Sequence, residues 1–365
     1  MSVKFGIFSL SQIPDQSRRA EAIQEELEEF VLAEQLGYDT AWVAEHLFST
    51  YGVVASTQVI AAAIAALTSR IRIGTAVSII PFNHPLRTAS DFGLIDIQSN
   101  GRLNFGVGRA YQPHEFTGLG LEMAESRQMF DEGMEMILAA WTQEKVDHHG
   151  KYWSTSGPVE VLPKPAQKPH PPVYMATISP ASFQTAADKG WGLQLAAPFT
   201  YRTYREEWMD KLAEHLADYE AACVAKGRDP KAAERAILVP FFCAETEDLA
   251  VERYARHVEW FYSKVSGHER PVGAAADKLV PGYELQFTEG KKTKEAGLLA
   301  FEHLHRHSAA IASDPAGCIS KLQFMREKFG ITEFILWFNI GGIDTELARE
   351  SMRLTMDKVI PHISA

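Results

Sequence analysis

The sequence predicts an α/β protein with a (β/α)8 barrel fold. Short apolar segments alternate with amphipathic segments of helical period along the chain of 365 residues. Several of the apolar segments are nearly continuous runs of aliphatic and β-branched residues, as in parallel strands covered on both faces. Eight such strands, each followed by a helix, indicate a TIM barrel, with a doubly wound open sheet as the alternative. The length is that of one barrel domain, residues 1–365, with insertions.

The expected elements follow in regular order. The predicted strands are Val3–Leu10, Thr40–Ala44, Ile71–Ile80, Leu103–Val107, Val173–Ala176, Gly192–Ala196, Ala236–Cys243 and Glu333–Phe338. The predicted helices are Glu21–Leu36, Thr57–Ser69, His84–Ser99, Ser126–Trp141, Pro180–Lys189, Tyr204–Lys226, Glu247–Lys264, Ala316–Phe329 and Thr345–Ile360. Two segments interrupt this order. The Pro-rich segment 147–172 is expected to be an irregular excursion from the barrel. The segment 266–313, which follows the seventh strand, is polar and weakly periodic, and we expect it to be a mobile lid.

Composition narrows the class of protein. The net charge of -11 and the pI near 5.7 argue against a nucleic-acid or anionic-membrane partner. Cys223, Cys243 and Cys318 are widely spaced and form no CxxC motif, which suits a reducing cytoplasm. The apolar run at the N-terminus is too short for a signal peptide, and no run reaches membrane-spanning length. We therefore expect a cytoplasmic protein.

In a barrel, chemistry belongs at the carboxyl ends of the strands. In the stretch GRLNFGVGRAYQPHEF a buried strand ends at Gly108-Arg109. The arginine is either a bidentate hydrogen-bond donor for an anion at that edge or simply a solvated side chain at the end of a strand. Four further candidate groups follow other strands: Glu45-His46, Ala76–Ile80, Thr177–Ser182 and Asn339. The position of His46 directly after the second strand fits a catalytic histidine as well as a structural one. The serines that begin the helix after the fifth strand could bind an anion at its N-terminus, or one of them could simply cap the helix.

Other signals are weak. Gly106-x-Gly108 lacks the third glycine of a dinucleotide fingerprint, and no P-loop or GxSxG elbow occurs. His303 and His307 could share a helical face, but one such pair in a polar segment is poor evidence for a metal site. We therefore expect no metal.

A further observation comes from a resemblance. The chain resembles the bacterial luciferase-like flavin monooxygenases, whose fold is the (β/α)8 barrel. The matching segments recur in order over nearly the full length: AWVAEHLF, RIGTAVSIIPFNHPLR, GRLNFGVGRAY, PVYMATISPAS, the seventh-strand region, DPAGCISKL and ESMRLTMDKVIPHI. Family members bind reduced FMN, react it with O2 to a flavin C4a-hydroperoxide, and pass one oxygen atom to a substrate.

The resemblance assigns roles to particular residues. His46 matches the family's catalytic histidine, with Glu45 as its neighbour beside the flavin. Ala76 and Val77 match the end of the third strand that lines the flavin, where the family often has a non-prolyl cis peptide.

The resemblance also implies a phosphate site. Arg109 matches the arginine that binds the flavin phosphate, and Tyr111 a flavin-contacting residue after it. Ser179 and Ser182 match the phosphate-binding hydroxyls. An arginine and a helix N-terminus suit a dianion, so both lines of reasoning agree.

Three positions depart from the luciferase pattern. Leu47 replaces the second histidine, Ile178 replaces an acidic residue, and Gly108 replaces the reactive cysteine. These changes leave flavin binding intact as an expectation and argue against light emission from an aldehyde.

The resulting hypothesis is a two-component monooxygenase. It would use FMNH2 from a separate reductase and O2 to oxygenate a small, largely apolar substrate, preferably a carbonyl compound, and would form a homodimer. A relative that transfers hydride with deazaflavin F420, and a non-catalytic partner subunit of the same fold, are the alternatives.

Overall fold

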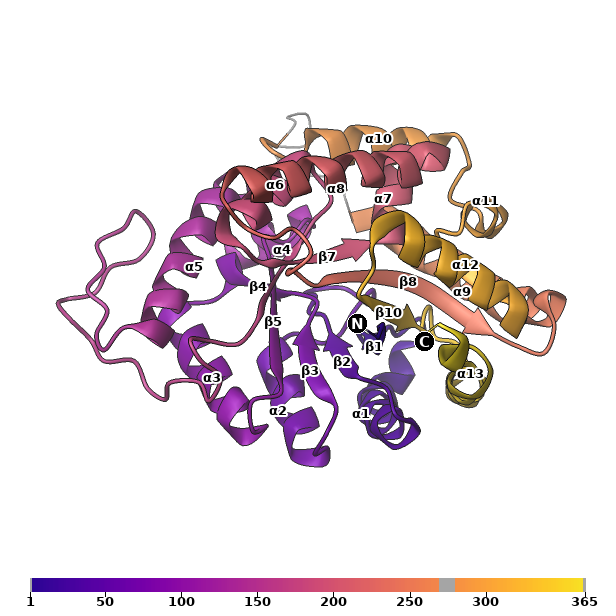
Figure 1. The fold of residues 1–365 in the computed structure, drawn as a ribbon, viewed down its shortest axis with the longest axis horizontal. Coiled ribbons are helices and arrows are strands. Elements are labelled where there is room, and N and C mark those ends of the chain that lie inside the picture. The colour runs from indigo at the N-terminus through magenta and orange to yellow at the C-terminus, as the bar shows by residue number, and fades with distance from the viewer. Residues whose placement is uncertain (1, 269–279, 364–365) are drawn as a thin grey trace.

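A closed barrel of eight parallel strands forms the centre of the protein, as the computed structural model shows for residues 2–268 and 280–363 (Figure 1). The barrel strands are β1 (Lys4–Ser9), β2 (Thr40–Val43), β3 (Arg72–Thr75), β5 (Leu103–Gly108), β6 (Val173–Ala176), β7 (Gly192–Ala196), β8 (Arg235–Cys243) and β10 (Glu333–Trp337). Strand β10 pairs in parallel with both β1 and β8. This pairing closes the sheet, so the predicted barrel is confirmed and the open-sheet alternative is wrong.

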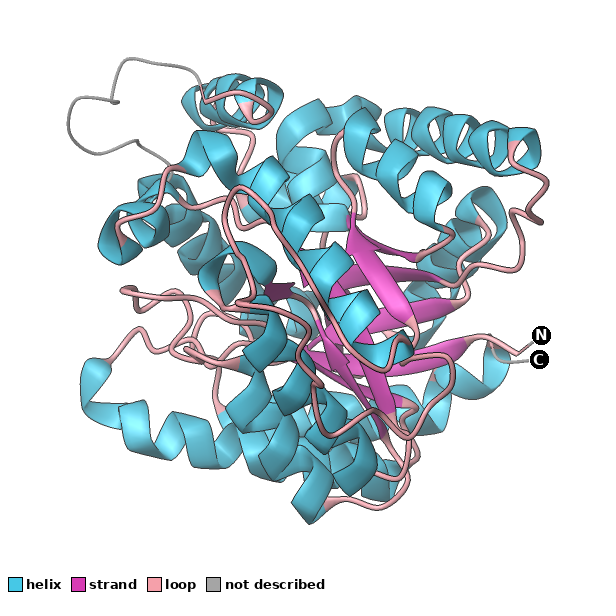
Figure 2. Cartoon of the chain, turned by 90° about the vertical axis from the view of Figure 1, so that its left-hand side faces the viewer, coloured by secondary structure: helices cyan, strands magenta, loops and turns pink. Residues whose placement is uncertain are grey.

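The helices surround the barrel, with the strands at the centre (Figure 2). They are α1 (Arg19–Leu36), α2 (Thr57–Leu67), α3 (Pro85–Gln98), α4 (Pro113–Leu119), α5 (Ser126–Thr142), α6 (Pro180–Lys189), α7 (Ala197–Tyr204), α8 (Trp208–Ala225), α9 (Glu247–His268), α10 (Glu284–Glu295), α11 (Phe301–Arg306), α12 (Pro315–Phe329) and α13 (Thr345–Lys358). Local signals set several of their ends. Ser56 and Asp314 accept N–H hydrogen bonds as N-caps, and Gly37 and Gly330 end helices in the left-handed conformation.

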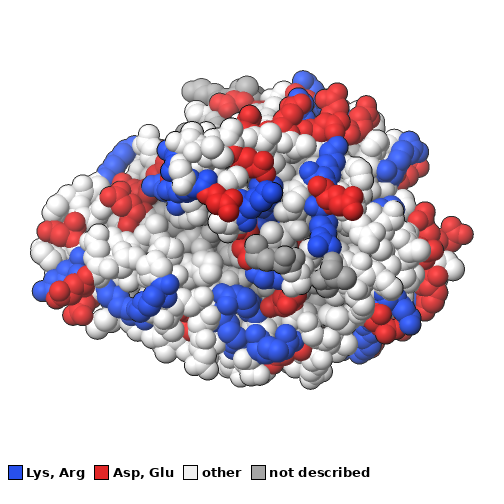
Figure 3. All heavy atoms as spheres, viewed as in Figure 1, with Lys and Arg blue, Asp and Glu red and all other residues white. Residues whose placement is uncertain are grey.

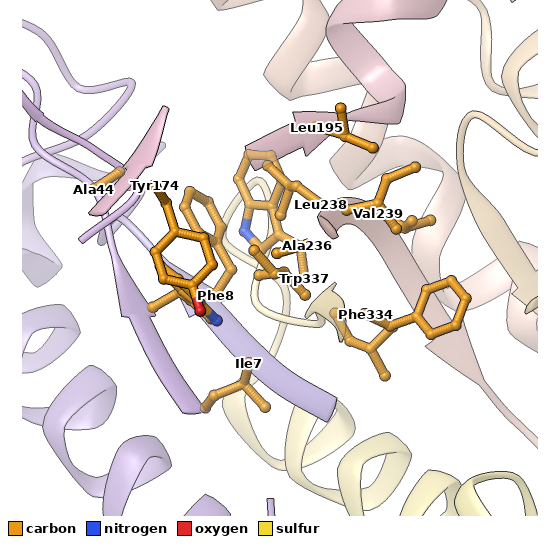
Figure 4. Packing of buried hydrophobic residues seen from close by; sticks show 14 of the residues in the cluster. Ile7, Phe8, Ala44, Tyr174, Leu195, Ala236, Leu238, Val239, Phe334 and Trp337 are labelled. Carbon is orange, nitrogen blue, oxygen red and sulfur yellow. The ribbon is translucent and has the colours of Figure 1, made fainter. Parts of the chain in front are cut away.

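Large side chains fill the barrel interior. Phe8, Leu238 and Trp337 point into it from three different strands (Figure 4). The rings of Phe8 and Trp337 meet edge to face with their centroids 4.9 Å apart. The interior is therefore a packed core, and space for a ligand remains only towards one end of the strands.

The predicted third strand, Ile71–Ile80, is wrong as a single element. It divides into β3 and β4 (Ser78–Ile79), and the peptide between Ala76 and Val77 is cis. Gly74 pairs with Asn104, whereas Ser78 pairs with Val107, so one extra residue lies in this strand relative to β5. The extra residue breaks the ladder and redirects the chain next to the site.

Two other boundaries differ from the sequence prediction. The predicted helix Tyr204–Lys226 corresponds to α8, which begins only at Trp208, after a short 3-10 turn. The helix before it, α7, is not predicted; it starts directly after β7 with Pro198 in its first turn. The predicted loop after Arg109 is partly helical, because Pro113 opens α4 at the first helical position.

The two insertions have different characters. Within 147–172 the chain forms only isolated antiparallel bridges, including His149 with Ser154. In the predicted lid 266–313, residues 269–279 lie outside the described part of the chain, and the remainder forms the end of α9, α10, α11 and β9 (Ile311–Ser313). The sequence pattern predicts neither α10 nor α11, because their apolar residues are sparse. The mobility of this segment stays a prediction.

Charge is dispersed over the face that Figure 3 shows. Lysine and arginine side chains alternate there with aspartate and glutamate, and uncharged surface separates the groups. This face therefore offers no continuous basic surface for a polyanion.

Candidate active site

A cavity opens at the carboxyl ends of the barrel strands and extends to the beginning of α10. The residues that the sequence and the resemblance single out for the flavin all line it: Glu45, His46, Ala76, Val77, Arg109, Tyr111, Ser179 and Ser182. They come from the connections after β2, β3, β5 and β6, so the barrel closure brings them together. Asn339 does not join them. Its amide donates to the buried carboxylate of Glu29 at 3.1 and 3.2 Å, so this candidate has a structural contact instead.

One wall of the cavity is apolar. It is formed by Phe8, Leu10, Leu195, Leu238, Ile335 and Trp337. Leu10 directly follows β1, the other five lie on β1, β7, β8 and β10, and all six are almost fully buried. Such a wall favours apolar ligand surface and offers few hydrogen bonds to water.

His46 lies in a buried hydrogen-bond network that the sequence analysis does not assign. Its Nδ1 atom is 2.9 Å from Oε1 of Glu115, and the N–H of Leu47 donates to the same oxygen at 2.9 Å. Glu115 is fully buried, and its other carboxylate oxygen has no hydrogen-bond partner among the described residues. An ionised Glu115 accepts a hydrogen bond from Nδ1–H and so selects the tautomer in which Nε2 is the accepting nitrogen.

Two tyrosines complete the surroundings of His46. The ring of Tyr51 meets the imidazole edge to face at 4.6 Å, and that of Tyr111 does so at 5.7 Å. The two tyrosine hydroxyls are 2.7 Å apart, and both residues line the cavity. Tyr51 and Glu115 are the residues that sequence reasoning missed. The one sequence signal for Glu115 was its place two residues after Pro113, in the first turn of a helix, where an acidic side chain is often held in a fixed position.

Glu45 has a different role from its neighbour. One of its carboxylate oxygens accepts hydrogen bonds from the N–H and hydroxyl of Thr57 at 3.0 and 3.1 Å, and the other accepts the N–H of Ile79 at 2.7 Å. Burial raises the pKa of this carboxyl, and the hydrogen bonds from Thr57 and Ile79 oppose the shift. Glu45 thus joins the end of β2 to the start of α2 and to β4.

The presence of glycine at position 108 has a steric explanation. A Cβ atom at this position would lie 2.6 Å from Cγ2 of Val77, well inside van der Waals contact. Because Val77 belongs to the redirected end of the third strand, only glycine fits opposite it in this arrangement. A cysteine at this position would need Val77 to move.

Arg109 is a cation with free donor groups. Its guanidinium carbon lies 4.8 Å from the ring centroid of Tyr283, and within the described residues it forms no hydrogen bond or ion pair. Burial lowers the pKa of Arg109, a shift that the neighbouring tyrosine opposes. A half-buried arginine that forms no ion pair with a described carboxylate is suited to an anionic ligand.

The N-terminus of α6 lines the same cavity. Ser179 is the N-cap, yet its side chain makes no capping hydrogen bond, so the simple capping interpretation is wrong for it. The hydroxyl of Ser182 donates to the carbonyl oxygen of Ser179 at 2.6 Å and accepts the N–H of Ile178 at 3.2 Å. A hydroxyl and a helix N-terminus therefore face the same cavity as Arg109, which fits a phosphate monoester.

The comparison with protein families identifies the wider group. A family model described as luciferase-like monooxygenase matches residues 3–333. The chain belongs to this family. The predicted resemblance is thereby confirmed.

The chain is also similar to several curated proteins and solved structures. The uncharacterized protein y4vJ of Sinorhizobium fredii is 37% identical over 178 residues, a match that spans about half of each chain, 49% and 50%. The oxygenase component of the flavin-dependent trigonelline monooxygenase of Acinetobacter baylyi is 23% identical over 99% of this chain and 96% of its own. The crystal structure of the monooxygenase RslO1 from Streptomyces bottropensis superposes with a TM-score of 0.82 at 28% identity, covering 98% and 99% of the two chains.

Two expectations concern other kinds of site. Across residues 2–268 and 280–363, no group of three histidine, cysteine, aspartate or glutamate side chains is arranged to hold a metal ion. Of the two candidate histidines, His303 lies 3.4 Å from Glu302, and the ring of His307 lies 5.9 Å from that of Tyr201. Nor does any described helix combine the length and the apolar character needed to cross a bilayer.

Proposed function

We propose that this protein is the oxygenase component of a two-component flavin monooxygenase, using reduced FMN and O2 to oxygenate a small, largely apolar substrate. The observation that carries the proposal is the shared cavity, in which Arg109 and the N-terminus of α6 lie with His46 and an apolar wall. The trigonelline monooxygenase relative, a flavin-dependent oxygenase component, supports it.

The residues of the cavity fit FMN. Arg109, Ser179 and Ser182 would hold the phosphate, because they combine a cation that forms no ion pair with any described residue and a helix N-terminus. Ala76 and Val77 would lie against the ring system. When bound, reduced FMN supplies the electrons that activate O2.

His46 is the proposed proton carrier. Glu115 orients its ring through Nδ1, which leaves Nε2 to accept or donate a proton during oxygen transfer. Tyr51 and Tyr111 pack against the imidazole and restrict its rotation.

The apolar wall defines the substrate class. Phe8, Leu238 and Trp337 offer hydrophobic surface, so the substrate is a compound with a large apolar part, and a carbonyl compound is favoured. The wall also keeps bulk water from the reacting groups, which protects an activated oxygen species from loss as hydrogen peroxide.

A separate flavin reductase is the proposed source of reduced FMN. The Gly106-x-Gly108 segment forms the end of β5 and lacks the features of a nicotinamide site. The purified protein alone is therefore expected to leave NADH unoxidised. Absorbance at the NADH band, followed with and without an added reductase, checks this, and NADH consumption by the protein alone contradicts it.

The proposed quaternary state is a homodimer. Helices α2 and α3 expose large apolar side chains, with Val59 67% exposed, Leu67 53% and Leu94 56%. A second copy of the chain could cover these residues. Light scattering on a gel-filtration peak is expected to give twice the chain mass, and Val59→Asp with Leu94→Asp should reduce it to one chain.

The central experiment mixes the anaerobic protein–FMNH2 complex with ¹⁸O2 in the presence of candidate ketones and aldehydes. Incorporation of one ¹⁸O atom into a product, with little hydrogen peroxide, is the expected result. His46→Ala should lower product yield while FMN binding persists. Stoichiometric peroxide with every substrate contradicts the proposal and favours a non-catalytic subunit, and reduction of substrate by reduced F420 under anaerobic conditions favours the hydride-transfer alternative.

A further inference from the structure

A tyrosine from the segment after β8 lies against the proposed phosphate-binding arginine. The ring of Tyr283 faces the guanidinium of Arg109 at 4.8 Å, although the two residues are far apart in the sequence. Tyr283 itself lines the cavity together with its neighbour Gly282. The chain that leads into α10 therefore forms part of the wall next to Arg109.

Tyr283 is held in place from several sides. Its hydroxyl donates to the carbonyl oxygen of Ala110 at 2.8 Å and lies 3.1 Å from Oγ of Ser126. Its ring stacks on Phe287 with centroids 5.9 Å apart. The side chain is only 4% exposed, so the ring presents a fixed surface to the guanidinium.

The chemistry of this contact differs from that of an ion pair. A carboxylate partner would accept the N–H groups of Arg109 and cancel its charge. An aromatic face attracts the guanidinium through its quadrupole and accepts none of those N–H groups along the guanidinium plane. Arg109 is thereby oriented while its donors stay available for a dianion.

We infer that Tyr283 is a positioning residue for phosphate binding, which holds Arg109 in the orientation that recognises the phosphate monoester of the flavin nucleotide. The inference rests on the proposed function, since it takes the phosphate of FMN as the ligand of Arg109. It adds the start of the segment before α10 to the cofactor site.

Riboflavin provides the test, because it has the flavin ring but lacks the phosphate. Dissociation constants for oxidised FMN and riboflavin are measured by fluorescence quenching in the wild type, Tyr283→Leu and Tyr283→Phe. Tyr283→Leu is expected to weaken FMN binding by about threefold to thirtyfold and to leave riboflavin binding unchanged. Tyr283→Phe keeps the ring, so it should retain most of the preference for FMN.

Two further variants make the test specific. Phe324→Leu removes an exposed aromatic ring of α12 that does not line the cavity, and the ratio of the two constants should stay within about twofold of wild type. In an Arg109→Ala background, Tyr283→Leu should have no additional effect on that ratio. Circular dichroism and thermal unfolding confirm that each variant is folded.

The outcomes separate the inference from the proposed function. Suppose that Tyr283→Leu weakens the binding of FMN and of riboflavin equally, or leaves both unchanged, while Arg109→Ala abolishes the preference for FMN. The inference is then wrong and the phosphate site stands. If the wild type binds FMN no better than riboflavin, or Arg109→Ala leaves the preference intact, the proposed cofactor site itself fails.

Discussion

One carboxylate oxygen of Glu115 lies 2.9 Å from Nδ1 of His46, and the same oxygen accepts the N–H of the following residue, Leu47. The two side chains are 69 residues apart in the sequence. This contact fixes both the ring and the backbone of the proposed proton carrier, so the properties of His46 depend on α4 as well as on β2.

Glu115→Gln tests this dependence. The amide keeps the size of the side chain but removes the negative charge that orients the imidazole. We expect product formation in a single turnover to slow by at least about tenfold, because an acid–base group contributes on this scale only when it is correctly oriented. FMN affinity should change by less than about twofold, since Glu115 does not belong to the phosphate site. Glu122→Gln, at an exposed acid close by, is the matched control. An equal loss of product formation in Glu115→Gln and Glu122→Gln, or no loss in either, contradicts the role of Glu115 in orienting His46.

Glu45→Gln should lower the free energy of unfolding. Every described donor around Glu45 is an N–H or O–H group that requires an oxygen acceptor. An amide places an NH2 group against at least one of them, and an unsatisfied buried donor costs about 1–3 kcal/mol. Urea unfolding measures this loss. Unchanged stability would mean that the backbone donors of Thr57 and Ile79 find other acceptors.

Gly108→Ala tests the close approach of Val77. The added methyl group meets Cγ2 of Val77, and overpacking of this kind costs about 1–3 kcal/mol. We expect weaker FMN binding and lower thermal stability. Adding Val77→Ala removes the obstructing methyl groups, so the double variant should recover part of both losses. If the losses simply add, the two side chains do not conflict.

The buried carboxyl group of Glu26 should make the stability of the protein depend on pH. It is fully buried on α1, and burial, together with the neighbouring charge of Glu29, raises its pKa from 4.5 to about 8. Between these values the folded state holds a proton that the unfolded state has released, so stability falls as pH rises through this window. Glu26→Gln removes the titration, and its melting temperature should gain on wild type between pH 5.5 and 8.5. The exposed Glu21→Gln is the control. A pH-independent difference contradicts the prediction.

The sequence by itself determined the barrel and the side of it that bears the site. Alternation of apolar strands and amphipathic helices reports local burial, and parallel strands necessarily bring their carboxyl ends to one edge. Arg109, His46 and Ser179 each follow a strand, so their convergence could be predicted without knowing any distance. The resemblance then supplied their proposed roles.

Only the tertiary structure decided which side chains touch. Glu115, Tyr51 and Tyr283 reach the site from a first helical turn, from the segment before α2 and from the segment before α10. Asn339 follows a strand as the candidates do, yet it turns to Glu29. Periodicity records whether a residue is buried, whereas its partner depends on how separate connections pack over the barrel, which no local pattern encodes.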